Sequence, residues 1–241
     1  MRNYGVIGFP VKHSFSPRYF EQKFEVLGLS DCQYKAYEME NLSGIKDLVK
    51  DENLLGFNVT IPFKQEIIPF LTGISEAAKA MNAVNTVTVT DNGWIGDNTD
   101  FIGFRNSIRK HLHPYFNYAL IFGTGGSSNA VRYALKQLGI PHATVSRGNL
   151  VDFSYMDLTE EDIKEHNLLI NTTPLGSLAS IDECVNIPYS AIAKKHVCFD
   201  LIYTPAETVF LQKAKKQGAK IENGLEMLEI QADKSWEIWN K

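Results

Sequence analysis

One lysine and one carboxylate in this chain could together move a proton. Lys64 follows an apolar strand-like run and the turn Thr60-Ile61-Pro62-Phe63, and Asp100 closes the polar run Gly96-Asp97-Asn98-Thr99. An ammonium held by a carboxylate can donate a proton to a carbonyl oxygen and take it back from the alcohol. Taken separately, Lys64 suits an exposed helix start and Asp100 a helix cap. Taken together, they predict an acid/base pair for carbonyl–alcohol interconversion, with Asp100 orienting Lys64.

Hydroxyl and amide side chains accompany this pair. Ser14 and Ser16 stand where a helix is predicted to begin, and hydroxyls beside free backbone amides suit a carboxylate group. Helix capping is the simpler role for Ser16, and a packing or turn role is the simpler one for His13. Thr60 and Asn85 follow strand-like runs. Each could merely complete a loop, but several convergent donors and acceptors would suit a polyhydroxylated acid.

A glycine-rich turn stands in the second half of the chain. Gly123-Thr124-Gly125-Gly126-Ser127 lies between a predicted strand and a predicted helix, where backbone amides can approach a pyrophosphate. Ser128 replaces the third glycine of the usual fingerprint, so a purely structural turn stays an alternative. About 20 residues on, NAD-binding domains carry an acidic residue, whereas this chain has Ser146-Arg147-Gly148. Because arginine can pair with a 2′-phosphate, we predict NADP rather than NAD; a solvated surface arginine is the alternative.

Strand and helix patterns alternate almost throughout, which predicts a parallel α/β architecture. In the first half we expect strands at 4–8, 34–37, 55–60, 83–90 and 93–96, the last two as a hairpin. Helices there are expected from Ser16, over 42–50, and around Ile67, Phe70 and Leu71. In the second half we expect strands at 118–122, 142–146, 168–171 and 196–201, and helices at 127–138, 208–217 and 225–240.

Composition argues against several other classes of protein. Hydrophobic residues make up 44% and charged residues 22%, which is ordinary for a soluble protein with a core. A net charge of −4 without a basic block argues against nucleic acid as a partner. The three cysteines are scattered, so we expect neither disulfides nor a metal site, in keeping with the cytoplasm. We find no secretory signal and no apolar run of about 18 residues, and therefore expect no membrane span.

The chain resembles shikimate dehydrogenases along nearly its whole length. The matching motifs occur in the family order: Gly8-x-Pro10-x-x-His13-Ser14-x-Ser16-Pro17, Asn58-Val59-Thr60-x-Pro62-Phe63-Lys64, Ala83-Val84-Asn85-Thr86, Asn98-Thr99-Asp100, Gly123-x-Gly125-Gly126, Asn171-x-Thr173-Pro174-Leu175-Gly176, Asp200-Leu201-Ile202-Tyr203-x-Pro205 and Gly224-x-x-Met227-Leu228-x-x-Gln231-Ala232. The lysine and aspartate motifs are highly specific, whereas the glycine turn is not.

The resemblance implies an NADP-dependent oxidoreductase that reversibly reduces 3-dehydroshikimate to shikimate, in chorismate and aromatic amino-acid biosynthesis. It implies Lys64 as the acid/base, Asp100 as its partner, and Ser14 and Ser16 as ligands of the substrate carboxylate. The other implied positions are Thr60, Asn85, Tyr203 and Gln231 for the substrate, and Gly123, Thr124, Gly125, Gly126, Ser127, Ser146, Arg147, Leu201, Gly224 and Met227 for NADP, with Met227 near the nicotinamide.

The family fold implies two α/β domains with a cleft between them. Residues 1–100 plus 225–241 would form a substrate-binding domain with a mostly parallel sheet, and 101–224 a Rossmann-like NADP-binding domain. The chain departs from the family at Ser146-Arg147-Gly148, where Asn-Arg-Thr is common, and at Asn82, where glycine is common. The alternatives are a quinate/shikimate dehydrogenase that uses NAD and a catalytically silent dinucleotide-binding sensor. We expect small-molecule partners only, and a monomer or a homodimer.

Overall fold

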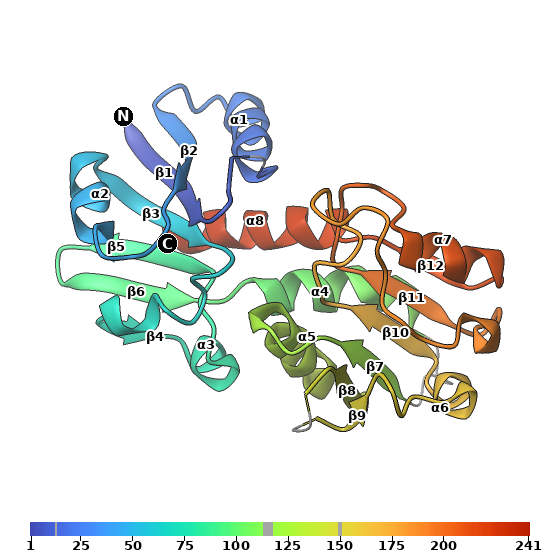
Figure 1. Ribbon diagram of the computed structural model, residues 1–241. Coiled ribbons are helices and arrows are strands. Elements are labelled where there is room, and N and C mark those ends of the chain that lie inside the picture. The colour runs from blue at the N-terminus through green and yellow to red at the C-terminus, as the bar shows by residue number, and fades with distance from the viewer. Residues whose placement is uncertain (13, 113–117, 149–150) are drawn as a thin grey trace. The chain divides into compact units, whose positions relative to one another are not determined.

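The computed structural model describes residues 1–12, 14–112, 118–148 and 151–241, whose helices and strands are drawn in Figure 1. The expectation for His13 therefore lies outside the described residues. By their internal contacts the residues form two units: unit 1 contains 1–100 and 231–241, and unit 2 contains 101–230. The division expected from the sequence falls after 224, and the two divisions differ only in residues 225–230, the beginning of helix α8 (Leu225–Trp239).

Unit 1 is built on a six-stranded mixed sheet. Its elements are β1 (Arg2–Gly8), α1 (Ser16–Val26), β2 (Cys32–Glu38), α2 (Ile45–Asp51), β3 (Leu54–Val59), the 3-10 turn η1 (Ile68–Phe70), β4 (Gly73–Ile74), α3 (Glu76–Met81), β5 (Thr86–Thr90) and β6 (Gly93–Asp97). The strand order is β2-β1-β3-β5-β6-β4. Strand β1 pairs in parallel with β2 and β3, whereas β5 is antiparallel to β3 and to β6, as the predicted hairpin requires.

The two faces of this sheet bury separate cores. Successive side chains of a strand point to opposite faces. Accordingly, Tyr4 and Val6 of β1 pack with Phe20 of α1 and Ala232 of α8, whereas Ile7 packs in the core that contains residues of α2. Helices α1 and α8 therefore cover one face, and α2 covers the other. Figure 1 shows these helices around the blue-to-teal strands.

Unit 2 is built on a six-stranded sheet that is parallel throughout. Its elements are α4 (Asp100–Ile108), η2 (Arg109–His111), β7 (Ala119–Phe122), α5 (Gly126–Gln137), β8 (His142–Ser146), β9 (Phe153–Ser154), α6 (Glu160–Glu165), β10 (Leu168–Asn171), η3 (Tyr189–Ala191), β11 (Val197–Asp200), α7 (Val209–Lys216) and β12 (Lys220–Glu222). The order β12-β11-β10-β7-β8-β9 is that of Rossmann sheets, with the first strand, β7, at the centre. The predicted fold class, α/β with two mostly parallel sheets, is confirmed.

The predicted helix around Ile67, Phe70 and Leu71 is wrong. The structure has only the 3-10 turn η1 there, with Pro69 inside it. Proline lacks a backbone N–H and its ring collides with the preceding helical turn, so a longer helix cannot pass through this position. The predicted helix over 42–50 begins later, at Ile45, because the Asn41 side chain accepts from the backbone N–H of Ser43 and forms a turn instead.

The expected cap at Ser16 is also wrong. Helix α1 begins at Ser16 itself, its N-cap is Phe15, and no side chain caps it. The backbone N–H of Ser16 donates to Ser14 Oγ at 3.3 Å, so the local serine turn involves Ser14.

The departure at Asn82 has a structural reason. Asn82 ends α3 with a left-handed φ of 49°, a conformation that glycine adopts freely and asparagine tolerates.

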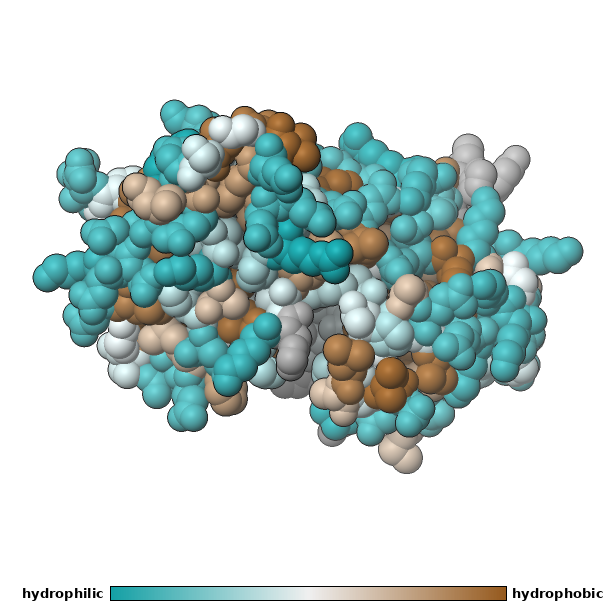
Figure 2. Space-filling view, turned by 90° about the horizontal axis from the view of Figure 1, so that it is seen from above, coloured by the Kyte–Doolittle hydropathy of each residue, from teal (hydrophilic) through white to brown (hydrophobic). Residues whose placement is uncertain are grey.

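The surface seen in Figure 2 is mostly hydrophilic, with hydrophobic residues in separate patches. Within the described part of the chain, none of the helices combines the length and the apolar character needed to cross a membrane. The three cysteines are all free thiols, and Cys198 is buried in the core of unit 2.

Candidate active site

Lys64 is held by the turn that follows β3. Its neighbours Phe63 and Ile67 are fully buried in the core of unit 1, and its backbone carbonyl accepts a hydrogen bond from Val84 N at 2.7 Å. The backbone on both sides of the lysine is therefore anchored. This anchoring positions Lys64 more tightly than an exposed helix start would.

Lys64 and Asp100 are in contact. Lys64 Nζ lies 2.6 Å from Asp100 Oδ2, and the two side chains are only 13% and 9% exposed. Asp100 begins α4, and its backbone N–H donates to Asn98 Oδ1 at 3.0 Å. A charge pair removed from water interacts more strongly than a surface pair. Lys64 and Asp100, which are 36 positions apart in the chain, therefore meet within unit 1.

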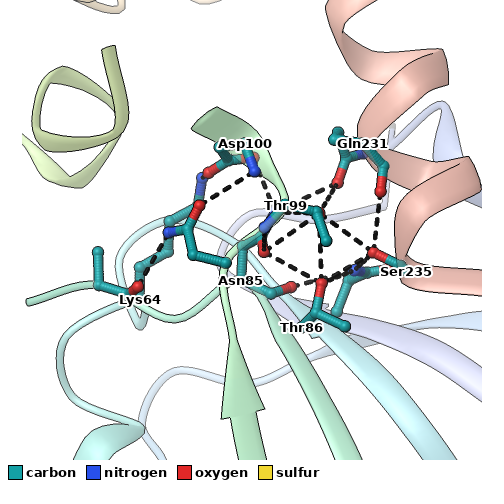
Figure 3. Close-up of polar contacts among 10 residues, drawn as sticks. Lys64, Asn85, Thr86, Thr99, Asp100, Gln231 and Ser235 are labelled. Carbon is teal, nitrogen blue, oxygen red and sulfur yellow. Dashed lines mark hydrogen bonds and ion pairs between the residues drawn. The ribbon is translucent and has the colours of Figure 1, made fainter. Parts of the chain in front are cut away.

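The buried Asn85 amide orients the carboxylate. Its Oδ1 accepts from the backbone N–H of Thr99 at 2.7 Å, and because a backbone nitrogen can only donate, this bond fixes which end of the amide is oxygen. Asn85 Nδ2 must therefore face Asp100, and it donates to Oδ1 at 2.8 Å. Each carboxylate oxygen of Asp100 thus has one donor, Lys64 or Asn85 (Figure 3).

Gln231 reaches the same group of side chains from α8. Its Oε1 accepts from Asn85 Nδ2 at 3.2 Å and from Thr99 Oγ1 at 3.3 Å. Because Asn85 Nδ2 is a donor, the Gln231 atom that faces it is the oxygen. Gln231 Nε2 makes no hydrogen bond to another described residue, so this amide nitrogen can donate to a ligand. Figure 3 shows Gln231 extending from the helix toward Thr99 and Asn85.

The other predicted substrate residues of unit 1 lie before and at the start of α1 and directly after β3. Ser14 is half-buried and Ser16 is buried, and Ser16 contacts the Tyr34 hydroxyl. Burial raises the pKa of Tyr34 well above its usual range, so the phenol stays neutral and donates to Asn58 Oδ1 at 2.8 Å. Thr60 follows β3, and its backbone N–H donates to the carbonyl of Ile7. Asn58 Nδ2 donates to the carbonyl of Asn85, which links these residues to the Asp100 group.

In unit 2, the glycine turn joins the central strand to α5. Gly123 has φ +110°, a conformation that side chains disfavour, and a Cβ there would lie 2.7 Å from Thr172 Oγ1. Gly125 is the N-cap of α5, a Cβ there would meet open space, and no side chain caps the helix. Gly126 and Ser127 form the first turn, which carries no acidic residue. The uncapped amides at this helix start suit a pyrophosphate, and exposed Thr124 stands beside them.

The end of β8 lies directly beside this turn. Gly123 N donates to the carbonyl of Val145 at 2.9 Å, so Ser146 and Arg147 follow next to the glycine turn. Ser146 Oγ accepts from Gly148 N at 3.0 Å, and Arg147 is exposed beside Tyr155. The chain has no carboxylate at the end of β8 where NAD-binding domains carry one. This set of groups fits the phosphates of NADP.

The remaining predicted cofactor residues follow β11 and β12. A Cβ on Gly224 would lie 2.1 Å from the carbonyl oxygen of Leu201, so only glycine fits there. Leu201 N donates to the carbonyl of Asn171, and Gly224 N donates to that of Ile202. Met227 is buried in α8, and half-buried Tyr203 lies two residues beyond Leu201. Tyr203 belongs to unit 2, so its predicted contact with the substrate stays a prediction.

Asp200 is a buried carboxylate that no expectation assigned a role. Its Oδ1 accepts from Ile202 N and Asn171 Nδ2, and its Oδ2 accepts from Thr208 Oγ1 at 2.6 Å. Asn171 Oδ1 in turn accepts from the backbone of Thr173, which lines the glycine turn. Asp200 therefore ties together the loops that follow β10 and β11. Burial raises its pKa to about 6, against the hydrogen bonds from Thr208, Ile202 and Asn171, which lower it.

This burial gives a prediction for stability. The folded-state pKa of Asp200 lies above its usual value of 3.8, so folding favours the protonated form. The protonated carboxyl group of Asp200 therefore stabilises the folded state fully below about pH 4. This stabilisation, about 3 kcal/mol in the free energy of unfolding, is lost as the pH rises through about 6. In urea unfolding between pH 4 and 7, the nearly isosteric variant Asp200→Asn should lose stability with rising pH less than the wild type. Equal slopes for the two proteins would contradict the assignment.

Sequence reasoning missed several polar residues of unit 1. Thr99 and Thr86 were quoted only as parts of motifs, and Ser235 was not singled out. Ser235 is fully buried and contacts both threonines. A signal was present, because Ser235 lies one helical turn after Gln231 and so shares its face of α8.

A buried lysine–carboxylate pair with buried amide partners, together with a Rossmann sheet, is the arrangement expected of an oxidoreductase that acts on a CH–OH group. The model of the shikimate dehydrogenase substrate binding domain matches residues 6–87. A relative named shikimate dehydrogenase (NADP(+)) from Staphylococcus aureus strain MSSA476 is 35% identical over 98% of this chain and 91% of its own. The chain belongs to the shikimate dehydrogenase family.

Solved structures agree with this assignment. Shikimate dehydrogenase from Aquifex aeolicus is 38% identical, with a TM-score of 0.88 over 100% of this chain and 92% of that one. Shikimate 5-dehydrogenase from Thermus thermophilus, in complex with NADP(H) and shikimate, is 29% identical, with a TM-score of 0.88 over 99% and 93% of the two chains. The predicted family is thereby confirmed.

Proposed function

We propose that this protein catalyses the reversible, NADP-dependent interconversion of 3-dehydroshikimate and shikimate. The observation that carries the proposal is the Lys64–Asp100 pair, with its 2.6 Å contact and low exposure, in a chain whose other sheet has the Rossmann order. The relative from Staphylococcus aureus and the Thermus thermophilus complex, by their names, support the choice of cofactor and substrate.

Lys64 transfers the proton of the reaction. When the ring carbonyl is reduced, the Lys64 ammonium donates a proton to its oxygen, and in the reverse direction the Lys64 amine takes the proton from the alcohol. Bound NADPH supplies the hydride that the carbon receives. Asp100 holds the ammonium in place and stabilises its charge, and Asn85 keeps the carboxylate from turning away. An error of about 1 Å in such positioning can cost on the order of 10² in rate.

Substrate recognition is assigned to the polar groups of unit 1 and to Tyr203. Lys64 Nζ and Gln231 Nε2 keep hydrogens for ring hydroxyls, because each nitrogen uses fewer of its hydrogens within the described residues than it carries. Ser14, Ser16 and Thr60 supply short hydroxyl groups for the carboxylate and the ring. In unit 2, the uncapped start of α5 would hold the pyrophosphate, and Arg147 would hold the 2′-phosphate.

A four-way assay tests the proposed function. The purified protein is given shikimate or quinate, each with NADP or NAD, and the absorbance of the reduced nicotinamide is followed. We expect the highest kcat/KM with shikimate and NADP. Faster turnover of quinate with NAD would favour the quinate/shikimate alternative, and NADP binding without turnover of either acid would favour the silent sensor.

A further inference from the structure

One face of helix α8 carries a stripe of three residues spaced one turn apart: Gln231, Ser235 and Trp239. Residues four apart in a helix lie above one another, separated by about 6 Å along the axis. All three form side-chain hydrogen bonds with residues 1–100 of unit 1: Gln231 with Asn85, Ser235 with Asn58, and Trp239 with the carbonyl of Val87. The stripe therefore connects a predicted substrate residue to two anchors further along the helix.

Ser235 is the polar anchor of this stripe. Its side chain is fully buried, and its Oγ lies 2.9 Å from Asn58 Nδ2 and 2.8 Å from Thr86 Oγ1. It also donates to the carbonyl of Gln231, one turn earlier, at 3.0 Å. Serine is a mediocre helix former inside a helix. Here it joins Asn58 of β3 and Thr86 of β5 to the turn of α8 that carries Gln231. Figure 3 shows Ser235 between Thr86 and Gln231.

Trp239 is the apolar anchor. Its ring fills the space beside Gly56, where an added Cβ would lie 2.4 Å from Nε1. The same ring stacks on Tyr4 with centroids 5.0 Å apart, and its Nε1 donates to the carbonyl of Val87 at 2.9 Å. This fit restricts rotation of the helix about its axis. It leaves the finer placement of the preceding turns to the hydrogen bonds of Ser235.

We propose that Ser235 is a positioning residue for Gln231, acting through the placement of α8 so that the Gln231 amide meets Asn85 and keeps Nε2 directed at the substrate. The proposal rests on the proposed function for the identity of that substrate. The orientation of the Gln231 amide matters because three acceptors, on Gln231, Thr99 and Asp100, surround Asn85 Nδ2. Asn85 Nδ2 has only two hydrogens to share among them. A displaced Gln231 would lose its bond to Asn85, while the Lys64–Asp100 pair would stay intact.

The test begins with Ser235→Ala. The change leaves Asn58 Nδ2 bonded to Asn85 O and Thr86 Oγ1, and Thr86 Oγ1 bonded to Asn85 Oδ1, so no buried donor loses its last partner. We expect the KM for shikimate to rise about tenfold, the effect of one weakened hydrogen bond. The kcat, the KM for NADP and the pH profile should stay close to those of the wild type, because the proton-transfer pair is unchanged.

Ser107→Ala is the matched control. Ser107 is also a fully buried helical serine that donates to a carbonyl one turn back, that of Phe104, but it lies in α4 of unit 2 and forms no hydrogen bond with the described active-site residues. Its removal should leave the KM for shikimate unchanged. A rise in KM of the same size for both serine variants would overturn the proposal, because a general loss of stability would then explain the effect.

A double-mutant cycle with Gln231→Ala separates positioning from a direct effect. If Ser235 acts through Gln231, then Ser235→Ala should change the KM little once the Gln231 side chain is gone. Additive effects in the cycle would overturn the proposal while leaving the proposed function intact.

A measurement without turnover keeps the two proposals apart. The side-chain amide NMR signals of Asn85 and Gln231 should shift in Ser235→Ala and stay in place in Ser107→Ala. If the wild type turns over neither acid, the proposed function fails and these signals alone decide the role of Ser235. Unshifted signals in Ser235→Ala would overturn that role.

Discussion

Replacing Lys64 with alanine is expected to cost on the order of 10² or more in kcat while changing substrate binding by less than roughly tenfold. The ammonium is the group proposed to transfer the proton, so its loss should act mainly on the chemical step. Asp100 keeps its hydrogen bond from Asn85 in the variant, which limits the damage to the site. Steady-state turnover of shikimate with NADP gives the first quantity, and a binding titration with the substrate gives the second.

Lys35→Ala is a suitable control for this experiment. Lys35 Nζ also pairs with a carboxylate of unit 1, Glu52, at 3.1 Å, but both side chains are at least one-third exposed. Exposed ion pairs contribute about 0–1 kcal/mol, so this variant should retain the turnover of the wild type. If Lys64→Ala weakened substrate binding as much as it lowered kcat, an acid/base role for the lysine would be ruled out.

Arg147→Ala is expected to weaken NADP binding about ten- to a hundredfold and NAD binding much less. A hydrogen bond to a charged group contributes about 1.5–3 kcal/mol, and only NADP carries the 2′-phosphate that Arg147 would meet. The exposed position of Arg147, directly after the strand that adjoins the glycine turn, supports this assignment. Dissociation constants of the two cofactors, measured by titration at the same ionic strength, check the result.

Arg132→Ala removes the same charge from the exposed side of α5 and serves as the control. It should lower the affinities for NADP and NAD by similar, small factors. An unchanged ratio of the two affinities in Arg147→Ala would reject the phosphate assignment. The cofactor preference would then have to come from other groups.

The elements that the sequence predicted best are those whose signal is local. The strands at 142–146 and 168–171 were predicted with the observed bounds. The apolar run at 168–170 is typical of a strand buried on both faces of a parallel sheet. The segment around Ile67 failed because its apolar spacing is helical, whereas Pro69 prevents the helix. The spacing of apolar residues indicates which side of a segment is buried. The backbone N–H that Pro69 lacks decides whether that segment can form a helix.

The candidate active site was only partly predictable, because many of its contacts join residues that are far apart in the chain. Lys64 and Asp100 could be paired from their chemistry, and the resemblance pointed to the same two residues. The arrangement around Asn85 depends on contacts across up to 146 residues of chain, which no local pattern encodes. Ser235 was missed because a buried serine looks the same in the sequence as one that faces solvent, and only its four-residue spacing from Gln231 pointed to it. Asp200 was missed because burial, which sets its pKa, is a property of the folded chain.

The last eleven residues of the chain, 231–241, belong to unit 1, whereas unit 2 is a single continuous segment. On the ribosome, unit 2 can therefore complete its sheet before unit 1 receives its final helix. Until Trp239 emerges, the hollow beside Gly56 stays empty and Tyr4 lacks its stacking partner. A nascent polypeptide interrupted before residue 231 would carry Lys64 and Asp100 without Gln231, and would present an uncovered aromatic surface to chaperones and proteases.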